Sequence, residues 1–245
     1  MSIPKPFSTP FGRRAADRKQ VLRDEVRFVK TLATLLCLLL LAGCAAFPGD
    51  ELPSQPFRAP ASEQQQRPNV LVEFNFYRGE AQNQDATSIA VAREGLKPTL
   101  RKVLEGSGLF ERITLVPEPG RPDDALLRLK LYNSTSYAAA IASGLITGAT
   151  FFLVPGTAKD DYVLTAEWLA PGSQAPARAR NAASVRTWMG VWFLPLAASH
   201  SAGTAIEETF ARQVNDALKQ LQADGAFADR SSPAGNGAAP APVNP

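Results

Sequence analysis

Residues 69–77 read Asn-Val-Leu-Val-Glu-Phe-Asn-Phe-Tyr, and this stretch decides the fold class. An apolar side chain recurs at every second position, on one face of an extended chain: Val70, Val72, Phe74 and Phe76. Glu73 and Asn75 alternate with them on the other face. A period of two is typical of a β-strand that buries one side and leaves the other wet. The stretch therefore predicts a strand of a half-covered sheet.

Further elements follow outward from this strand. Alternating or short apolar runs predict strands over 69–77, 109–116, 125–132, 161–169 and 182–188. Apolar residues at helical spacing predict one amphipathic helix over 85–105, kinked or split at Pro98, and another that begins with a Thr204–Glu207 capping box. The order β-α-β-β-β-β-α predicts an α+β fold: a single antiparallel or mixed sheet of about five strands, with both helices on one face.

A leader precedes this domain. Residues 31–41 are uncharged and rich in leucine, and they follow Arg27 and Lys30 directly. Eleven to thirteen apolar residues are too few for a membrane span, which needs about 20, but they suit the central region of a signal peptide. Thirty residues before the run are long for such a leader, so we expect that translation starts at Val26.

Leu41-Ala42-Gly43-Cys44 follows the apolar run and resembles the lipobox of bacterial lipoproteins. The resemblance implies that residues 1–43 are a signal peptide, cleaved before Cys44, and that acyl chains (palmitate among them) are joined to the Cys44 sulfur and amine. Ala45 and Ala46, rather than an aspartate, follow the cysteine, which implies anchoring in the outer membrane, facing the periplasm. The alternative is an ordinary signal peptide or anchor with an incidental cysteine.

The basic character of the chain belongs to the leader. The net charge is +3, but residues 1–43 hold eight of the 26 basic and three of the 23 acidic residues, which leaves −2 for the remainder. Positive charge before the apolar run is typical of exported proteins. A net charge of −2 on the chain after residue 43 argues against a nucleic-acid partner. Cys37 lies in the leader, so Cys44 is the only cysteine after cleavage and no intramolecular disulfide can form.

Composition divides the cleaved chain into three parts. Residues 44–68 are rich in Pro, Gln and Ser and predict a lipidated N-terminus on a flexible tether. Residues 69–225 predict the periplasmic α+β domain, and residues 226–245 predict a disordered tail.

Two apolar segments stand out within the domain. Residues 137–154 contain no charge, and residues 188–198 are rich in aromatic side chains. A transmembrane helix over 137–154 is excluded by topology, because strands of the same sheet flank it on both sides. Two interpretations remain: both segments are core, or they form an exposed surface that contacts a membrane or partner. The second assigns that contact to Phe151, Phe152, Trp188, Trp192 and Phe193.

Signatures of chemistry are absent from the sequence. His200 is the only histidine, and no His/Cys spacing of metal type, phosphate-binding loop or nucleophile motif occurs. We therefore predict a protein that is not an enzyme and has no metal or cofactor. Arg178, Arg180 and Arg186 lie close together in sequence, which we interpret as protection of a sheet edge rather than an anion site.

A second resemblance concerns residues 100–116. This helix-turn-strand stretch, with its Ser107-Gly108-Leu109-Phe110 corner, is similar to periplasmic α/β lipoprotein domains of envelope assembly and transport systems. The lipid anchor, the tether, the absence of catalytic motifs and the two apolar segments together predict an accessory lipoprotein that docks on a cell-envelope assembly or transport complex. The alternative is a carrier in which residues 137–154 and 188–198 line a pocket for a lipid-like ligand.

Overall fold

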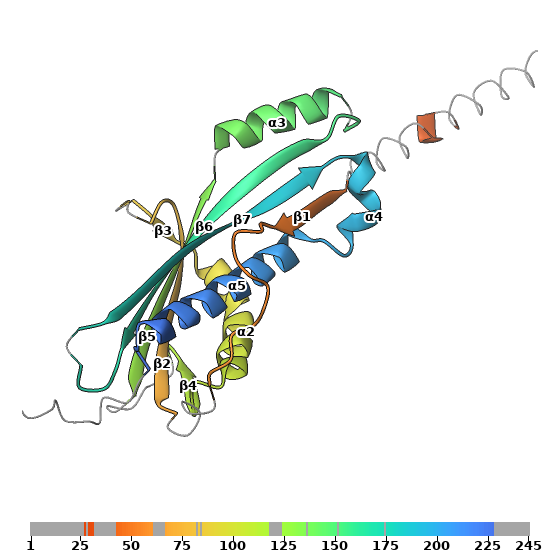
Figure 1. Ribbon diagram of the computed structural model, residues 1–245. Coiled ribbons are helices and arrows are strands. Elements are labelled where there is room, and N and C mark those ends of the chain that lie inside the picture. Colours follow the sequence, from red (N-terminus) through yellow and green to blue (C-terminus); the bar gives the residue numbers. More distant parts are fainter. Residues whose placement is uncertain are drawn as a thin grey trace, which may run out of the picture.

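The computed structural model describes residues 27, 29–31, 43–60, 67–81, 83, 85–117, 124–135, 137–150, 152–173 and 175–227. This part of the chain forms one open β-sheet with helices packed against it (Figure 1). Most of the predicted signal peptide lies outside the described residues, as do residues 61–66 and 228–245.

The α+β prediction is confirmed, but the sheet has seven strands rather than about five. Their order is β1-β7-β6-β5-β2-β3, and β4 also pairs with β2. Strand β2 runs parallel to β4 and β5, and every other pair is antiparallel, so the sheet is mixed. The added strands are β1 and β3. The bounds are β1 Cys44–Pro48, β2 Asn69–Arg78, β3 Thr87–Ser88, β4 Arg112–Leu115, β5 Ala125–Thr135, β6 Gly156–Leu169 and β7 Ala177–Met189.

Two long helices cover one face of the sheet, as predicted. Apolar side chains of α2 and α5 meet the alternating apolar residues of the strands in a single core. Phe210 of α5 and Phe74 of β2 lie at its centre, with ring centroids 5.0 Å apart. The intervening strand residues, which point away from α2 and α5, are mostly half-buried or exposed. The helices are α2 Ala90–Ser107, α3 Tyr137–Ala149, the 3-10 turn η2 Val191–Phe193, α4 Leu194–Ala197 and α5 Ala202–Ala223.

Helix α5 begins before the expected capping box. Ser201, not Thr204, is its N-cap, because the Ser201 hydroxyl oxygen accepts a hydrogen bond from the Thr204 backbone N–H at 3.1 Å. A serine at this position satisfies one of the N–H groups that the first turn leaves without a partner.

The segment predicted as a flexible tether packs on the domain instead. Residues 44–48 are strand β1, paired with β7, and Ala45 and Ala46 are buried. Further on, the backbone N–H of Phe57 donates to Asn215 Oδ1 at 2.9 Å, and that of Ala59 to the Ser107 carbonyl at 2.8 Å. Proline and serine prevent regular structure in residues 49–60, but the segment's N–H groups still find acceptors on α2 and α5.

The predicted tail also begins later than expected. Ala226 is buried, and the Phe227 ring packs edge-on against Trp168 with centroids 5.0 Å apart. These two residues therefore belong to the core. The Phe227 ring, which follows the end of α5, covers the side of the sheet at Trp168. The rest of that prediction falls on residues outside the described part of the chain.

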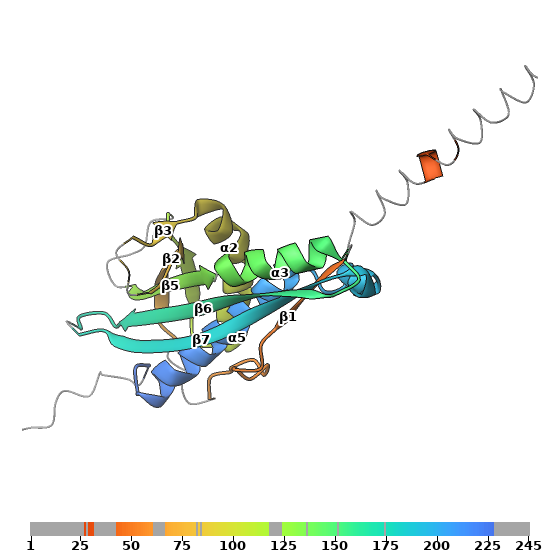
Figure 2. The same ribbon diagram turned by 90° about the horizontal axis from the view of Figure 1, so that it is seen from above.

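One end of the sheet is extended by a long hairpin. Strands β6 and β7 pair from Gly156↔Met189 to Trp168↔Ala177, whereas β5 pairs with β6 only as far as Asp160. The first residues of β6 thus reach beyond β5. Figure 2 shows this hairpin from above, with α3 lying along β6 and α4 at the far end. This extension carries the site described next.

Candidate membrane-facing site

Cys44 lies at the open end of the β6–β7 hairpin, opposite the turn that joins the two strands. It is exposed, and it is the first residue of β1. The register sets its position: Cys44 pairs with Met189 of β7, and Met189 pairs with Gly156, the first residue of β6. The predicted lipid attachment point is therefore at the end of the sheet, without any intervening linker.

Helix α3 reaches the same end and is held against β6. The backbone N–H of Thr157, at an edge that β5 no longer covers, donates to the Ser143 hydroxyl at 2.8 Å. A Cβ atom at Gly156 would overlap the Thr147 hydroxyl, so only glycine permits this close approach. The helix thus replaces β5 as the neighbour of β6.

The η2–α4 segment covers the other side of this end. The Gly190 N–H donates to the Gly43 carbonyl at 3.2 Å, and the Ala46 N–H donates to the His200 carbonyl at 2.8 Å. The His200 ring packs on Phe47 with centroids 4.8 Å apart, which assigns the only histidine a structural position. We call this end, made by residues 43–49, 137–158 without Phe151, and 187–201, the Cys44 end (Figure 1).

Apolar side chains are exposed over the Cys44 end. Eight of the eleven large apolar side chains that the described residues expose lie there. Trp192 is 67% exposed and Leu145 is 69% exposed. The eight residues are Ile141, Leu145, Ile146, Leu153, Val154, Trp192, Leu194 and Leu196. Concentration of exposed apolar area at one place marks an interaction surface, since isolated exposed apolar residues would be scattered.

Charge is missing from the same region. Residues 43–49, 137–158 and 187–206, which are far apart in the sequence, contain no Asp, Glu, Lys or Arg. The register brings these three segments together at one end. A charge-free apolar surface can enter a region of low dielectric constant without the large cost of desolvating an ion.

The predicted aromatic contacts are only partly exposed. Trp192 lies on the surface, and its indole N–H donates to the Leu153 carbonyl at 3.0 Å. Trp188 and Phe193 are half-buried and pack on each other at 5.7 Å. Phe152 is half-buried in a left-handed conformation, with φ of 62°, and its carbonyl accepts from the Val191 N–H. Phe151 lies outside the described residues.

The aliphatic part of the surface was not among the predicted contacts. Ile141 and Leu145 lie four residues apart on one face of α3, and Ile146, next to Leu145, is exposed as well. This spacing within an uncharged helix was the signal in the sequence, but it is equally typical of a buried helix. No helix among the described residues combines the length and the hydropathy that a membrane crossing needs.

Other candidate sites are not assembled here. Within the described ranges, His, Cys, Asp and Glu do not gather in groups of three that could hold a metal. Asp124 pairs with Arg112 at 3.3 Å and Asp161 with Lys159 at 2.8 Å, so both carboxylates are in ion pairs. Two surface pockets, one at Lys130 and one at Arg93, are lined by elements other than residues 137–154 and 188–198. Neither is the apolar pocket expected of a carrier.

Comparison with known proteins gives structural likeness only. No family model and no curated protein matches the sequence. A homologue of a neuraminyllactose-binding hemagglutinin from Helicobacter pylori is 11% identical, with 72% of this chain and 96% of that chain covered and a TM-score of 0.35. Rare lipoprotein B from Shewanella oneidensis is 16% identical, with 63% and 96% covered and a TM-score of 0.30. The PelC dodecamer from Paraburkholderia phytofirmans is 11% identical, with 75% and 99% covered and a TM-score of 0.27. One of these similar structures is thus a bacterial lipoprotein, and at such scores the function of this chain must be argued from its own residues.

Proposed function

We propose that this chain is a lipid-anchored accessory protein of the bacterial envelope, held by acylated Cys44 at the periplasmic face of the outer membrane. Its Cys44 end rests on the bilayer, and the rest of the domain is presented to an envelope complex. The observation that carries the proposal is the meeting of Cys44 and a charge-free apolar surface at one end of the sheet.

Geometry supports contact with the bilayer rather than suspension above it. Strand β1 starts at Cys44 itself, and the Leu194 backbone lies against the preceding Gly43, so acyl chains on Cys44 would enter the membrane beside the η2–α4 segment. Cleavage before Cys44 leaves every β1–β7 pair in place, from Cys44↔Met189 to Pro48↔Val185. The lipid therefore acts on a rigid element.

Energetics favours insertion of the apolar side chains once the lipid is in place. Removal of apolar surface from water contributes about 25 cal/mol per Å². A side chain already held at the surface by a covalent anchor does not bear a second cost of association, because its effective concentration there is high. Tryptophan prefers the interface, where the ring is in an apolar layer and the N–H is near polar groups.

The proposal assigns docking to the remainder of the domain. A protein fixed at one end presents its other surfaces in a constant orientation, which suits assembly of a complex at the membrane. Ala45 and Ala46 after the cysteine are the residues that the lipobox resemblance associates with the outer membrane.

Photo-crosslinking in intact cells tests this proposal. With a photoreactive amino acid at position 192 or 145, we expect lipid adducts, because both side chains face the bilayer. The same amino acid at position 91, whose valine is 85% exposed on α2, is the matched control and should give none. Equal lipid labelling at all three positions, or labelling at position 91 alone, would contradict the orientation proposed.

A further inference from the structure

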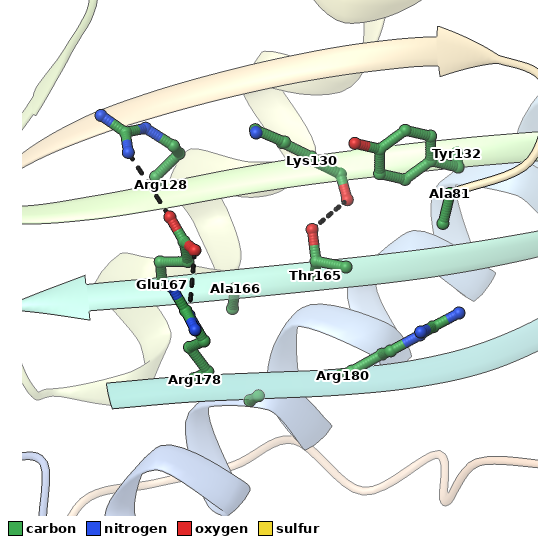
Figure 3. Close-up of a pocket in the computed structure, with 10 residues that line it drawn as sticks. Ala81, Arg128, Lys130, Tyr132, Thr165, Ala166, Glu167, Arg178 and Arg180 are labelled. Carbon is green, nitrogen blue, oxygen red and sulfur yellow. Dashed lines mark hydrogen bonds and ion pairs between the residues drawn. The ribbon is translucent and has the colours of Figure 1, made fainter. Parts of the chain in front are cut away.

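The sheet face opposite α2 and α5 carries a shallow pocket of about 350 Å³ over β5, β6 and β7 (Figure 3). Side chains of three strands line it, together with Ala81 from the connection after β2. Four of the lining residues are cations: Arg128, Lys130, Arg178 and Arg180.

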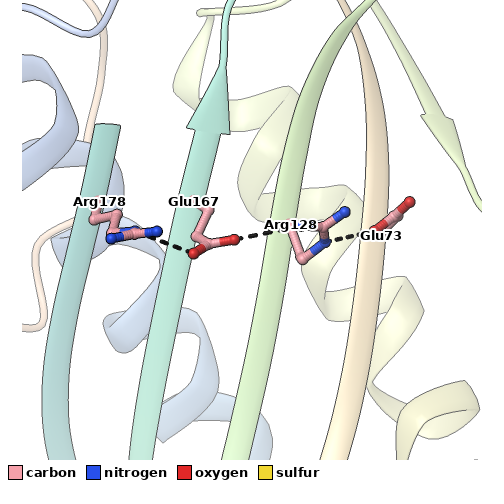
Figure 4. Close-up of polar contacts among 4 residues, drawn as sticks. All are labelled: Glu73, Arg128, Glu167 and Arg178. Carbon is pink, nitrogen blue, oxygen red and sulfur yellow. Dashed lines mark hydrogen bonds and ion pairs between the residues drawn. The ribbon is translucent and has the colours of Figure 1, made fainter. Parts of the chain in front are cut away.

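At one side of the pocket, four charged side chains form a row in which the two carboxylates neutralise the two arginines. Glu73, Arg128, Glu167 and Arg178 lie side by side on β2, β5, β6 and β7, with alternating charge (Figure 4). Arg128 Nε contacts Glu73 Oε2 at 2.7 Å, and the two Glu167 oxygens contact Arg128 at 3.4 Å and Arg178 at 3.1 Å. The hydrogen bond that Arg128 donates to Glu73 raises the pKa of Arg128. Both carboxylates are thus engaged with these two arginines.

The next row of side chains across the same three strands holds two cations and no carboxylate. Lys130 of β5 and Arg180 of β7 flank Thr165 of β6, because Thr165 pairs with Lys130 on one side and Arg180 on the other. Among the described residues, neither cation forms an ion pair, in contrast to the arginines of the neighbouring row. With strands about 4.8 Å apart, the Lys130 and Arg180 Cα atoms are separated by about 10 Å. In Figure 3 the two side chains point in opposite directions along the strands, and both are long enough to turn toward Thr165.

An aromatic row borders the cations on the other side. Tyr77 and Tyr132 stack with ring centroids 5.1 Å apart and an interplanar angle of 18°. Tyr132 is half-buried, and this burial raises the pKa of its phenol. Two like charges repel each other, and an anion bound between them offsets this repulsion.

Protection of a sheet edge does not account for this arrangement. Arg180 does lie on a part of β7 that β1 leaves uncovered, since β1 pairs only with residues 185–189. Lys130, however, is on β5, between β6 and β2 in the interior of the sheet. The interpretation made from the sequence concerned only Arg178, Arg180 and Arg186, so it does not explain Lys130.

We propose that this pocket binds a phosphate monoester group, with Lys130 and Arg180 as its cationic ligands and Tyr132 as a surface for the uncharged part of the molecule. A phosphate monoester carries a charge near −2 at neutral pH, which matches the two cations that lack carboxylate partners. Its oxygens accept hydrogen bonds from the N–H groups of lysine and arginine. The Thr165 hydroxyl, which makes only a long 3.5 Å bond to the Lys130 carbonyl, can reorient to donate as well.

Position along the sheet bears on the source of the phosphate. Thr165 is nine residues along β6 from Gly156, which corresponds to about 30 Å from the Cys44 end at 3.3 Å per residue. This separation favours a soluble phosphorylated molecule, such as a sugar phosphate, over a headgroup of the bilayer that holds Cys44. The binding chemistry itself is independent of the lipid anchor.

Calorimetric titration of the full, processed protein in detergent, with glucose 6-phosphate as the probe, tests the proposal. We expect saturable binding, weakened at least tenfold in Lys130→Gln/Arg180→Gln. The matched control, Arg101→Gln/Lys102→Gln on α2, loses the same two positive charges and should bind as the parent does. Melting temperatures establish that both variants are folded. Vesicles of phosphatidylcholine containing phosphatidic acid form a second arm, assayed by co-sedimentation with residues 44–245 produced without the leader and carrying Cys44→Ser.

Each outcome has a defined meaning. Loss confined to the Lys130→Gln/Arg180→Gln variant supports the site, and the arm in which it occurs identifies a soluble or a lipid-borne phosphate. Equal weakening in the two double variants, or no binding by the parent protein in either arm at millimolar phosphate, overturns the proposal. In the vesicle arm only co-sedimentation above that with phosphatidylcholine vesicles lacking phosphatidic acid counts as binding, so insertion of the Cys44 end does not decide the outcome.

Discussion

Replacing Cys44 with serine is expected to abolish maturation of the chain. A serine hydroxyl does not take the place of the thiol to which the lipobox resemblance assigns the diacylglycerol. The precursor should therefore keep residues 1–43, incorporate no fatty acid and be missing from the outer-membrane fraction. Labelling with radioactive palmitate, together with mass measurement of the purified chain, distinguishes the two forms directly.

The leader supplies a matched control for this experiment. Cys37 lies in the apolar run, seven residues before the expected cleavage site. Cys37→Ser should mature and take up palmitate as the parent does. If the Cys44→Ser chain is still cleaved, labelled and retained in the membrane, the lipid anchor proposed here is wrong.

Truncation of Phe210 to alanine should have the largest effect on the stability of the domain. This ring is 1% exposed and packs against Phe74, where α5 meets the sheet. Loss of a buried phenylalanine side chain lowers the free energy of unfolding by about 3–5 kcal/mol, because apolar contacts are lost and a cavity is left in their place. Domains are typically stable by only about 5–15 kcal/mol, so the variant should be close to unfolding.

Urea unfolding measures this effect as a fall in the midpoint at constant slope. Val91→Ala is the control, because Val91 is 85% exposed, and its free energy of unfolding should stay within about 0.5 kcal/mol of the parent. Similar losses for the two variants would show that α5 does not pack on the sheet as described.

The sequence predicted those elements whose pattern is local. Alternation over 69–77 and 125–132 specifies strands with one buried face, and the observed strands β2 and β5 include both ranges. Helical spacing likewise predicts α2 and α5, because Leu96, Leu100 and Leu104 recur on one face of α2. Such patterns need only the neighbouring residues to be interpreted.

Strand β1 escaped prediction because its partner is remote. Residues 44–48 have no alternation, and they follow a cleavage motif and precede a proline-rich stretch. Their strand conformation comes from pairing with residues 185–189 of β7. Composition therefore predicted a tether where the fold has an edge strand.

The candidate sites depend on register in the same way. The sequence indicated Cys44 and the apolar segments separately, and the pairs Cys44↔Met189↔Gly156 bring them to one end. Lys130 and Arg180 are fifty residues apart and become neighbours only through Thr165. A single sequence contains the side chains of these surfaces but not the pairing that assembles them.

Depth-dependent quenching of tryptophan fluorescence tests most directly whether the Cys44 end enters the bilayer. The acylated protein is reconstituted in vesicles of phosphatidylcholine with brominated acyl chains, and Trp192→Phe is compared with the parent. We expect strong quenching in the parent and loss of most of it in the variant, since Trp168 is buried in the core and Trp188 is half-buried. No quenching of the parent, or equal quenching of the two proteins, would contradict insertion of this surface.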